Sequence, residues 1–246
     1  MISRREALAT LVGAASLLAG CGSKGSDTFG RQLPPYRYRL SVTVDTPQGP
    51  RTGSSVIEVQ WSEPGTIMGS QGSAGYKIKG EAVAVDLPGG QKLFVLLRSK
   101  ADVDWAAYGL RGAVENLKDV RTGADRAVHA VPRSYKLQGE DVDNYPYFVR
   151  FRDLRDPKTV EQVDPGDLAK SFGPGVKLKA LTVQVTDEPL TRGIETRLGW
   201  LASVGRQRAT LIERPQRKPG EGLPLLRNAT PIQLVSPNDF STELYK

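Results

Sequence analysis

Strict alternation of apolar and polar side chains over residues 36–44 constrains the fold more than any other feature of this 246-residue chain. The apolar members are Tyr36, Tyr38, Leu40, Val42 and Val44. A period of two residues is that of a β-strand, because successive side chains of a strand point to opposite faces of its sheet. One buried face and one solvated face are typical of antiparallel sheets. The pattern therefore predicts an antiparallel strand buried on one face.

Further apolar patterns in the first half predict more strands. Residues 57–61 alternate in the same way, and turn-forming residues at 47–53 precede them, so this segment and the first strand form a predicted hairpin with a long connection. The unbroken apolar run at 93–97 predicts a central strand buried on both faces. Pro88-Gly89-Gly90 would join that strand to the one before it. Strands are also expected at residues 76–79, 83–87 and 92–97.

A helix and an irregular region follow these strands. Asp102 or Asp104 is a candidate N-cap for a helix. This helix would carry Trp105, Tyr108 and Leu110. Residues 111–144 are polar and poorly patterned, which predicts a long loop or a domain junction.

The second half mixes strands with short helices. Asp164 is expected to cap a helix that Gly173 ends, and Thr191 to cap another. The apolar parity changes between Ala180 and Leu181, which predicts a bulge or burial on both faces. The second helix would bury Ile194, Leu198 and Leu201, and strands are expected at residues 147–151, 176–185 and 232–235. The whole pattern predicts an α+β fold that is strand-rich, with a predominantly antiparallel sheet and a few short helices.

The first 21 residues predict a location. Arg4 and Arg5 precede an apolar stretch at 7–19, and small residues lead to Cys21, the only cysteine. This stretch is shorter than the roughly 20 apolar residues that span a bilayer. A charged start, an apolar run and a small-residue cleavage site are the parts of a signal peptide, which we assign to residues 1–20.

The string Leu18-Ala19-Gly20-Cys21 resembles the lipobox of bacterial lipoproteins. The resemblance implies cleavage between Gly20 and Cys21, followed by attachment of fatty acyl chains such as palmitate to Cys21. Each buried methylene contributes about 0.8 kcal/mol, so two or more chains give a stable anchor. The alternative is a chance match with a buried or disulfide-forming cysteine, although a lone cysteine has no partner within the chain.

Two further resemblances bear on export and sorting. Ser3-Arg4-Arg5-Glu6-Ala7-Leu8 is similar to a twin-arginine export signal, although Ala7 stands where such signals favour a large apolar residue, so the general secretory route stays open. By resemblance to lipoprotein sorting rules, Gly22 after the cysteine favours the outer over the inner membrane. We therefore expect a membrane-anchored lipoprotein of the bacterial cell envelope that faces the periplasm.

Five segments follow from these assignments. After the signal peptide, residues 21–35 form a lipidated flexible tether, because they are small, polar or proline. Residues 36–110 are expected to form an antiparallel β-rich unit and 145–246 a second α+β unit, with 111–144 as the junction. The two units either stand apart or pack as one domain.

Composition excludes several kinds of chemistry. With Cys21 acylated and His129 the only histidine, zinc sites built from thiolates or several histidines are excluded, and we expect no cofactor. A Ser-His-Asp triad would need His129, which we interpret as an ordinary histidine because the chain has no Gly-x-Ser-x-Gly motif. The glycine-rich segment 69–75 lacks the Gly-Lys-Ser/Thr ending of a phosphate-binding loop, so a loop between strands is expected there. The net charge of +7 comes from scattered basic residues, and we expect no nucleic-acid partner.

Carboxylates remain as candidate functional groups. Asp141, Asp143 and Asn144 are candidate calcium ligands, because calcium takes six to eight oxygen ligands. They lack the glycine turn and distal glutamate of an EF-hand, so we favour a solvated acidic loop. A glycoside hydrolase would need two carboxylates roughly 5 to 9.5 Å apart. Two segments supply acidic and aromatic residues together: Asp102, Asp104, Trp105 and Tyr108, and then Asp141, Asp143, Tyr145 and Tyr147.

Two functions stay open. The first is a non-catalytic, lipid-anchored envelope protein that binds an envelope protein or glycan, or has a structural role. The alternative is a carboxylate-dependent hydrolase of cell-wall glycan. Helix caps and turn aspartates explain both acidic segments with fewer assumptions, so we favour the first function. The hydrolase requires paired carboxylates that line a concave pocket.

Overall fold

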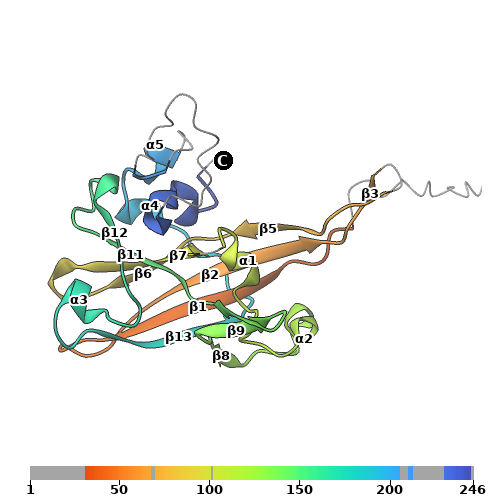
Figure 1. Ribbon diagram of the computed structural model, residues 1–246, viewed down its shortest axis with the longest axis horizontal. Helices are drawn as coiled ribbons and strands as arrows, with labels where there is room; N and C mark the ends of the chain where they lie inside the picture. Colours follow the sequence, from red (N-terminus) through yellow and green to blue (C-terminus); the bar gives the residue numbers. More distant parts are fainter. Residues whose placement is uncertain (1–30, 68–69, 101, 206–209, 213–229, 245–246) are drawn as a thin grey trace, which may run out of the picture.

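A computed structural model describes residues 31–67, 70–100, 102–205, 210–212 and 230–244. Two antiparallel sheets stack face to face, and short helices near the C-terminus cover the outer face of the second sheet (Figure 1). The expected signal peptide and lipidation site, with Arg4, Arg5, Gly20 and Cys21, lie outside the described residues.

The first sheet has the strand order β5-β2-β1-β13-β8. Its members are β1 (Tyr36–Asp45), β2 (Arg51–Ser62), β5 (Gly75–Lys79), β8 (Val128–Ala130) and β13 (Lys177–Val185). The predicted alternation in β1 is confirmed, because every second side chain is buried along the strand. β1 and β2 form the predicted antiparallel hairpin. The irregularity predicted between Ala180 and Leu181 is a bulge one residue earlier, at Lys179, since Thr43 pairs with Ala180 but Val44 pairs with Leu178.

The second sheet has the order β12-β11-β7-β6, and its two central strands are buried on both faces. Its members are β6 (Val83–Asp86), β7 (Lys92–Ser99), β11 (Pro146–Phe151) and β12 (Val160–Gln162). Leu93, Val95 and Leu97 of β7 pack into the core between the two sheets. Phe94 and Leu96 point the other way into a second core against the C-terminal segments. The predicted central strand with two buried faces is therefore confirmed.

Short elements complete the fold. The remaining strands are β3 (Thr66–Ile67), β4 (Ser70–Gln71), β9 (Ser134–Leu137) and β10 (Glu140–Asp143). The α-helices are α1 (Trp105–Tyr108), α2 (Leu117–Thr122), α3 (Ala169–Phe172), α4 (Ile194–Arg197) and α5 (Leu201–Gly205). Single 3-10 turns are η1 (Pro88–Gly90), η2 (Pro157–Thr159), η4 (Pro231–Leu234) and η5 (Pro237–Asp239). The predicted α+β class, strand-rich and antiparallel with few short helices, is confirmed.

The region 111–144 contains more structure than the expected loop. It holds α2, β8, β9 and β10, and β8 extends the first sheet by pairing with β13. Its strands carry exposed and half-buried side chains, so no strong apolar pattern marks them. The expected units 36–110 and 145–246 also interleave, because β13 pairs with β1 and β11 pairs with β7.

None of the expected capping side chains at Asp104, Asp164 and Thr191 makes a helix-cap hydrogen bond. The Asp164 carboxylate accepts a hydrogen bond from the Gly166 N–H at 2.8 Å, in a turn before α3. Thr191 accepts one from the Val56 N–H at 2.9 Å, which ties the chain to β2. Asp104 lies at the N-cap position of α1 but makes no side-chain cap hydrogen bond. The predicted end of α3 at Gly173 is confirmed, with a φ of 100°.

The last predicted strand, at 232–235, is wrong. Residues Pro231–Leu234 form the 3-10 turn η4 instead. Pro231 has the fixed φ that favours a first helical position, and the Gln233 side-chain oxygen accepts a hydrogen bond from the Thr230 N–H at 2.9 Å. Local capping therefore outweighs the short apolar pattern.

Candidate functional site

Side chains from the two acidic and aromatic segments line one cavity of about 400 Å³, which we call the aromatic cavity. It lies where β5, α1 and the β9–β10 hairpin meet. Tyr76, Trp105, Tyr108 and Tyr135 supply its rings, and Asp102, Arg111, Asp143 and Asn144 supply its main polar groups. Segments far apart in sequence thus bring carboxylates and aromatic rings to one place.

Two rings of this cavity, Tyr76 and Tyr108, pack against each other and against Trp61, which lies beside the cavity. Trp61, Tyr76 and Tyr108 pack edge to face, with centroid separations of 5.2, 5.3 and 5.6 Å. The Arg111 guanidinium lies 4.5 Å from the centroid of the Tyr108 ring. These contacts favour fixed ring orientations, which lower the entropy lost when a ligand binds.

Trp105 and Asn144 join the two segments. The Trp105 indole N–H donates to the Asn144 backbone carbonyl at 2.9 Å, and the Asn144 side-chain amide donates to the Arg111 carbonyl at 3.1 Å. Both side chains are buried. Because each buried donor has an acceptor, this junction is a rigid wall of the cavity.

The carboxylates at the cavity take part in local turns. Asp102 accepts from the Asp104 N–H at 2.8 Å, and Asp143 accepts from the Tyr145 N–H at 3.2 Å. The Tyr76 hydroxyl donates to the Asp104 carboxylate. Burial, and then this hydrogen bond, raise the pKa of Tyr76 well above its usual value. Tyr76 is therefore a neutral hydrogen-bonding group near neutral pH.

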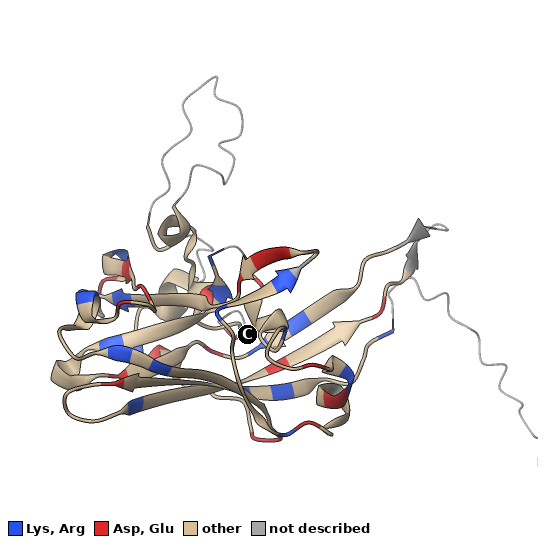
Figure 2. Ribbon diagram, turned by 60° about the horizontal axis from the view of Figure 1, so that its bottom comes forward, with Lys and Arg blue, Asp and Glu red and all other residues tan. Residues whose placement is uncertain are grey.

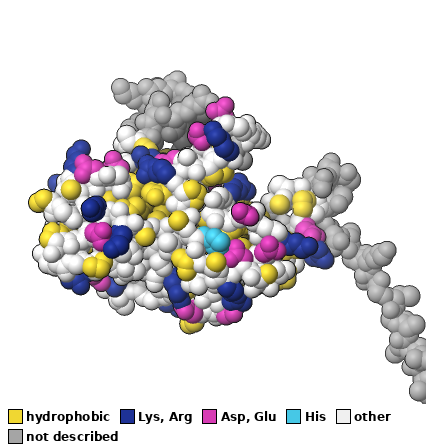
Figure 3. All heavy atoms as spheres, turned by 90° about the horizontal axis from the view of Figure 1, so that it is seen from below, with side chains coloured by type: hydrophobic (Ala, Val, Ile, Leu, Met, Phe, Trp, Pro, Cys, Tyr) yellow, Lys and Arg dark blue, Asp and Glu magenta, His cyan; other side chains and the backbone are white. Residues whose placement is uncertain are grey.

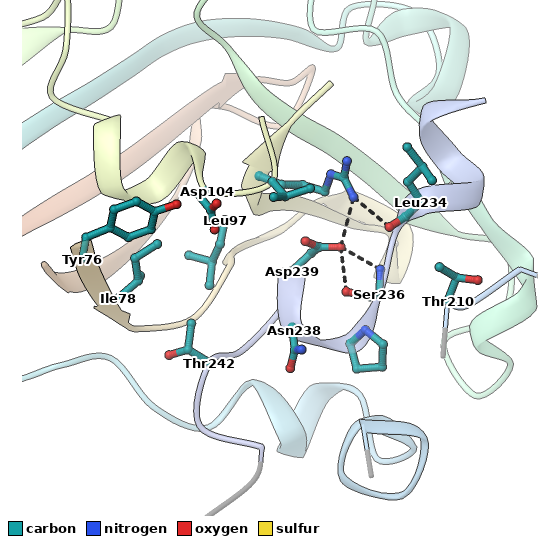
Figure 4. Close-up of a pocket in the computed structure, with 13 residues that line it drawn as sticks. Tyr76, Ile78, Leu97, Asp104, Thr210, Leu234, Ser236, Asn238, Asp239 and Thr242 are labelled. Atoms are coloured by element: carbon teal, nitrogen blue, oxygen red, sulfur yellow. Dashed lines mark hydrogen bonds and ion pairs between the residues drawn. The ribbon is translucent and has the colours of Figure 1, made fainter. Parts of the chain in front are cut away.

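A second cavity of about 620 Å³ adjoins the first, since Tyr76 lines both (Figure 4). Asp104 lies at the Tyr76 end, and Asp239 lies further in, beside Ser236. Asp239 accepts from the Ser236 N–H at 2.7 Å, and Arg98 Nη1 lies 3.6 Å from the Asp239 carboxylate. Burial raises the pKa of Asp239. This cavity therefore contains a buried ion pair.

The structure separates some residues that sequence reasoning grouped together. Asp141 pairs with Lys136 at 2.9 Å, whereas Asp143 lies 3.5 Å from Arg133. Tyr147 points into the core against the C-terminal segments and donates to Gln162 at 3.0 Å. Among the described residues, no group of three His, Cys, Asp or Glu side chains is placed to hold a metal ion.

His129 lies apart from the aromatic cavity, on the edge strand β8. Its Nε2 is 2.9 Å from Asp125, and both line a cavity of about 440 Å³ with Glu115 and Asp119. Figure 3 shows the histidine at the surface with acidic side chains nearby. No serine lies among the described residues of this cavity wall, so the residues of a catalytic triad do not meet here.

Sequence reasoning missed several charged and aromatic residues of the two cavities: Tyr76, Arg98, Arg111, Tyr135 and Asp239. Tyr76 and Tyr135 lie in short strands with exposed neighbours, and Asp239 lies in a 3-10 turn near the C-terminus. The sequence shows that these residues are aromatic or charged, but it contains no local pattern that places them beside residues 102–108 in the fold.

No family model, curated protein or solved structure matches this chain. In the part of the chain that the structure describes, no helix is long and apolar enough to cross a membrane.

Proposed function

We propose that this chain is a lipid-anchored protein of the bacterial cell envelope that binds a ligand in the aromatic cavity without turning it over. The convergence of Tyr76, Trp105, Tyr108 and Tyr135 with polar side chains in one cavity carries the proposal. A few placed polar groups among aromatic rings are typical of ligand sites.

The location rests on the N-terminal motif. Cleavage before Cys21 and acylation of its thiol would give a mature protein with a mass above that of its polypeptide. Intact-mass measurement of the protein purified from envelopes tests this. A mass equal to an unmodified polypeptide would contradict the anchor, and Cys21→Ser should release the protein from the membrane.

Glycan is the ligand class that this cavity fits best. The apolar faces of sugar rings pack on aromatic rings, and sugar hydroxyls need donors and acceptors such as Arg111, Asn144 and Asp102. The carboxylates that line the aromatic cavity accept backbone hydrogen bonds, which accords with a binding role rather than with a free acid and base.

Calorimetry with soluble cell-wall glycan fragments tests the binding site. Tyr108→Ala removes a ring and should weaken binding by about tenfold, because ring stacking contributes about 0.5–1.5 kcal/mol beyond area burial. Tyr108→Phe keeps the ring and is the matched control. Equal affinity of Tyr108→Ala and the unaltered protein would contradict this site.

A carboxylate-dependent glycan hydrolase is the second candidate. The observation that favours it is the presence of Asp104 and Asp239 in one cavity, with the pKa of Asp239 raised by burial. A hydrolase needs one protonated and one ionised carboxyl group. The test measures whether the protein releases reducing ends from cell-wall glycan. Release by the unaltered protein that is lost in both Asp104→Asn and Asp239→Asn would establish the hydrolase. Binding without release would exclude it.

A further inference from the structure

A fourth cavity, of about 580 Å³, is lined by basic side chains, and we call it the basic cavity. It lies at one end of the molecule, where the β6–β7 turn, the loop after β11 and α3 come together (Figure 1). Its charged lining residues are Lys92, Arg150, Arg152, Asp153 and Arg155. Over most of the molecule, by contrast, basic and acidic residues are interspersed (Figure 2).

Acidic side chains around this cavity are shared between cations. Glu161 contacts Arg150 at 2.8 Å and Arg152 at 2.9 Å. Asp86 contacts both Lys92 and Arg197, and Asp153 contacts Arg155. Within this network five cations face three carboxylates, which leaves a surplus of two positive charges. A concave surface with surplus positive charge attracts anions.

Arg150 is partly buried and held by neighbouring groups, whereas Arg152 and Arg155 are exposed. Arg150 donates to the Ser171 carbonyl and lies 5.8 Å from the centroid of the Phe172 ring. The Arg152 and Arg155 side chains are 69% and 91% exposed. Exposed guanidinium groups with several N–H donors match the geometry of phosphate oxygens.

The β6–β7 turn also lines this cavity. Gly89 and Gly90 line the cavity there with φ values of 71° and 76°. A Cβ built on either glycine would meet nothing within 4 Å, so the turn presents backbone beside open space. The two glycines thus place no side chain in this part of the cavity.

We propose that the basic cavity binds a phosphate-bearing ligand whose phosphoryl group contacts Lys92, Arg152 and Arg155. This site is separate from the aromatic cavity and goes beyond the function proposed above. Phosphoryl groups of lipid head groups and of soluble or polymeric ligands share this chemistry. The described chain begins at Arg31, near the end of β2 and at the opposite end of the molecule (Figure 1). That position favours a phosphoryl group that does not belong to the membrane of the proposed anchor.

Two probes distinguish the sources. Pyrophosphate is titrated calorimetrically into the full chain in detergent at low salt, and vesicles of phosphatidylglycerol are compared with phosphatidylcholine vesicles by co-sedimentation. We expect saturable pyrophosphate binding that weakens as salt screens the charges. Binding only to phosphatidylglycerol would support the site and identify a lipid head group as the source. Binding of neither probe would overturn the proposal.

Paired substitutions locate the binding. The double variant Arg152→Gln with Arg155→Gln should bind at least about tenfold more weakly, since it loses two charge-assisted contacts. Arg152→Lys with Arg155→Lys keeps the charge and should lose less affinity. Arg31→Gln with Arg126→Gln removes two exposed charges elsewhere and should bind as the unaltered protein does. Equal loss in this control would overturn the proposal, and thermal melting confirms that each variant is folded.

Discussion

Two buried carboxylates hold irregular segments of this protein in place. Glu81 accepts hydrogen bonds from the N–H groups of Gly193 and Ile194 at the start of α4, at 3.1 and 3.0 Å. Asp239 accepts from Ser236 and lies beside Arg98. Burial raises the pKa of both carboxyl groups. Each carboxylate thus supplies acceptors to segments that lack regular backbone pairing.

Glu81→Gln should change the pH dependence of stability. Because the folded-state pKa of Glu81 is raised above its unfolded value, folding favours the protonated form. Its contribution is therefore fully present below the unfolded pKa and is lost as pH rises through the folded pKa. The free energy of unfolding of the unaltered protein should fall relative to Glu81→Gln as pH rises above the ordinary pKa of a glutamate. Urea unfolding of both proteins measures this, and a constant difference would contradict it.

Asp239→Ala should destabilise the protein by about 3–5 kcal/mol, because it leaves the buried Arg98 without its carboxylate. The double variant Arg98→Met with Asp239→Leu should recover most of that loss, since it leaves no buried charge at this site. Asp141→Ala, at an exposed ion pair, is the control and should cost under about 1 kcal/mol. Guanidinium unfolding gives all three values. A double variant less stable than Asp239→Ala would disprove this account.

At the scale of elements, the approach of β2 to β6 determines how the two sheets stack. Gly53 of β2 lies so close to β6 that an added Cβ would be 2.2 Å from the Ala84 carbonyl oxygen. Nearby, the Ser55 hydroxyl donates to the Glu81 carbonyl at 2.6 Å. Gly53 and Ser55 therefore allow the backbones of β2 and β6 to approach each other closely.

Gly53→Ala should destabilise the fold by about 1–3 kcal/mol or more, because the new methyl group would force β2 and β6 apart. Gly199→Ala is the matched control, since its Cβ would meet nothing within 4 Å. Thermal and urea unfolding compare the two variants. Similar stability of both would show that the sheets tolerate a wider separation.

The whole molecule is a sheet-sheet-helix stack in which the C-terminal segments form part of the core. Phe240 packs on Phe94 and Phe151, with ring centroids 6.0 and 5.8 Å apart. The Ala82 N–H also donates to the Phe240 carbonyl at 2.8 Å. These contacts cover the outer face of the second sheet, so its central strands β7 and β11 are buried on both sides.

Phe240→Ala should cost about 3–5 kcal/mol, as expected for removal of a fully buried ring. Val128→Ala, at a side chain that is 62% exposed, should stay within about 0.5 kcal/mol of the unaltered protein. Denaturant unfolding measures both. A small effect at Phe240 would mean that the C-terminal layer contributes little to the stability of the sheets.

Strong apolar patterns predicted much of this fold, and weak local signals did not. The alternation of β1, the double burial of β7 and the bulge of β13 were visible because many side chains share one face. Segments such as β8 carry few buried side chains, and the caps at Asp164 and Thr191 act on neighbours that only the fold supplies. Of the candidate site, residues 102–108 and Asp143 were predicted, and the rings of Tyr76 and Tyr135 were not.

The sequence by itself determined the antiparallel, strand-rich class, because periodic burial is a local property of each strand. It also gave the expectation of a lipidation site at Cys21, because that expectation depends only on a contiguous motif. Only the tertiary structure decided that β13 pairs with β1, that 102–108 and 143–144 line one cavity, and that four basic side chains line another. Such contacts join residues distant in sequence, and their geometry arises when the sheets stack.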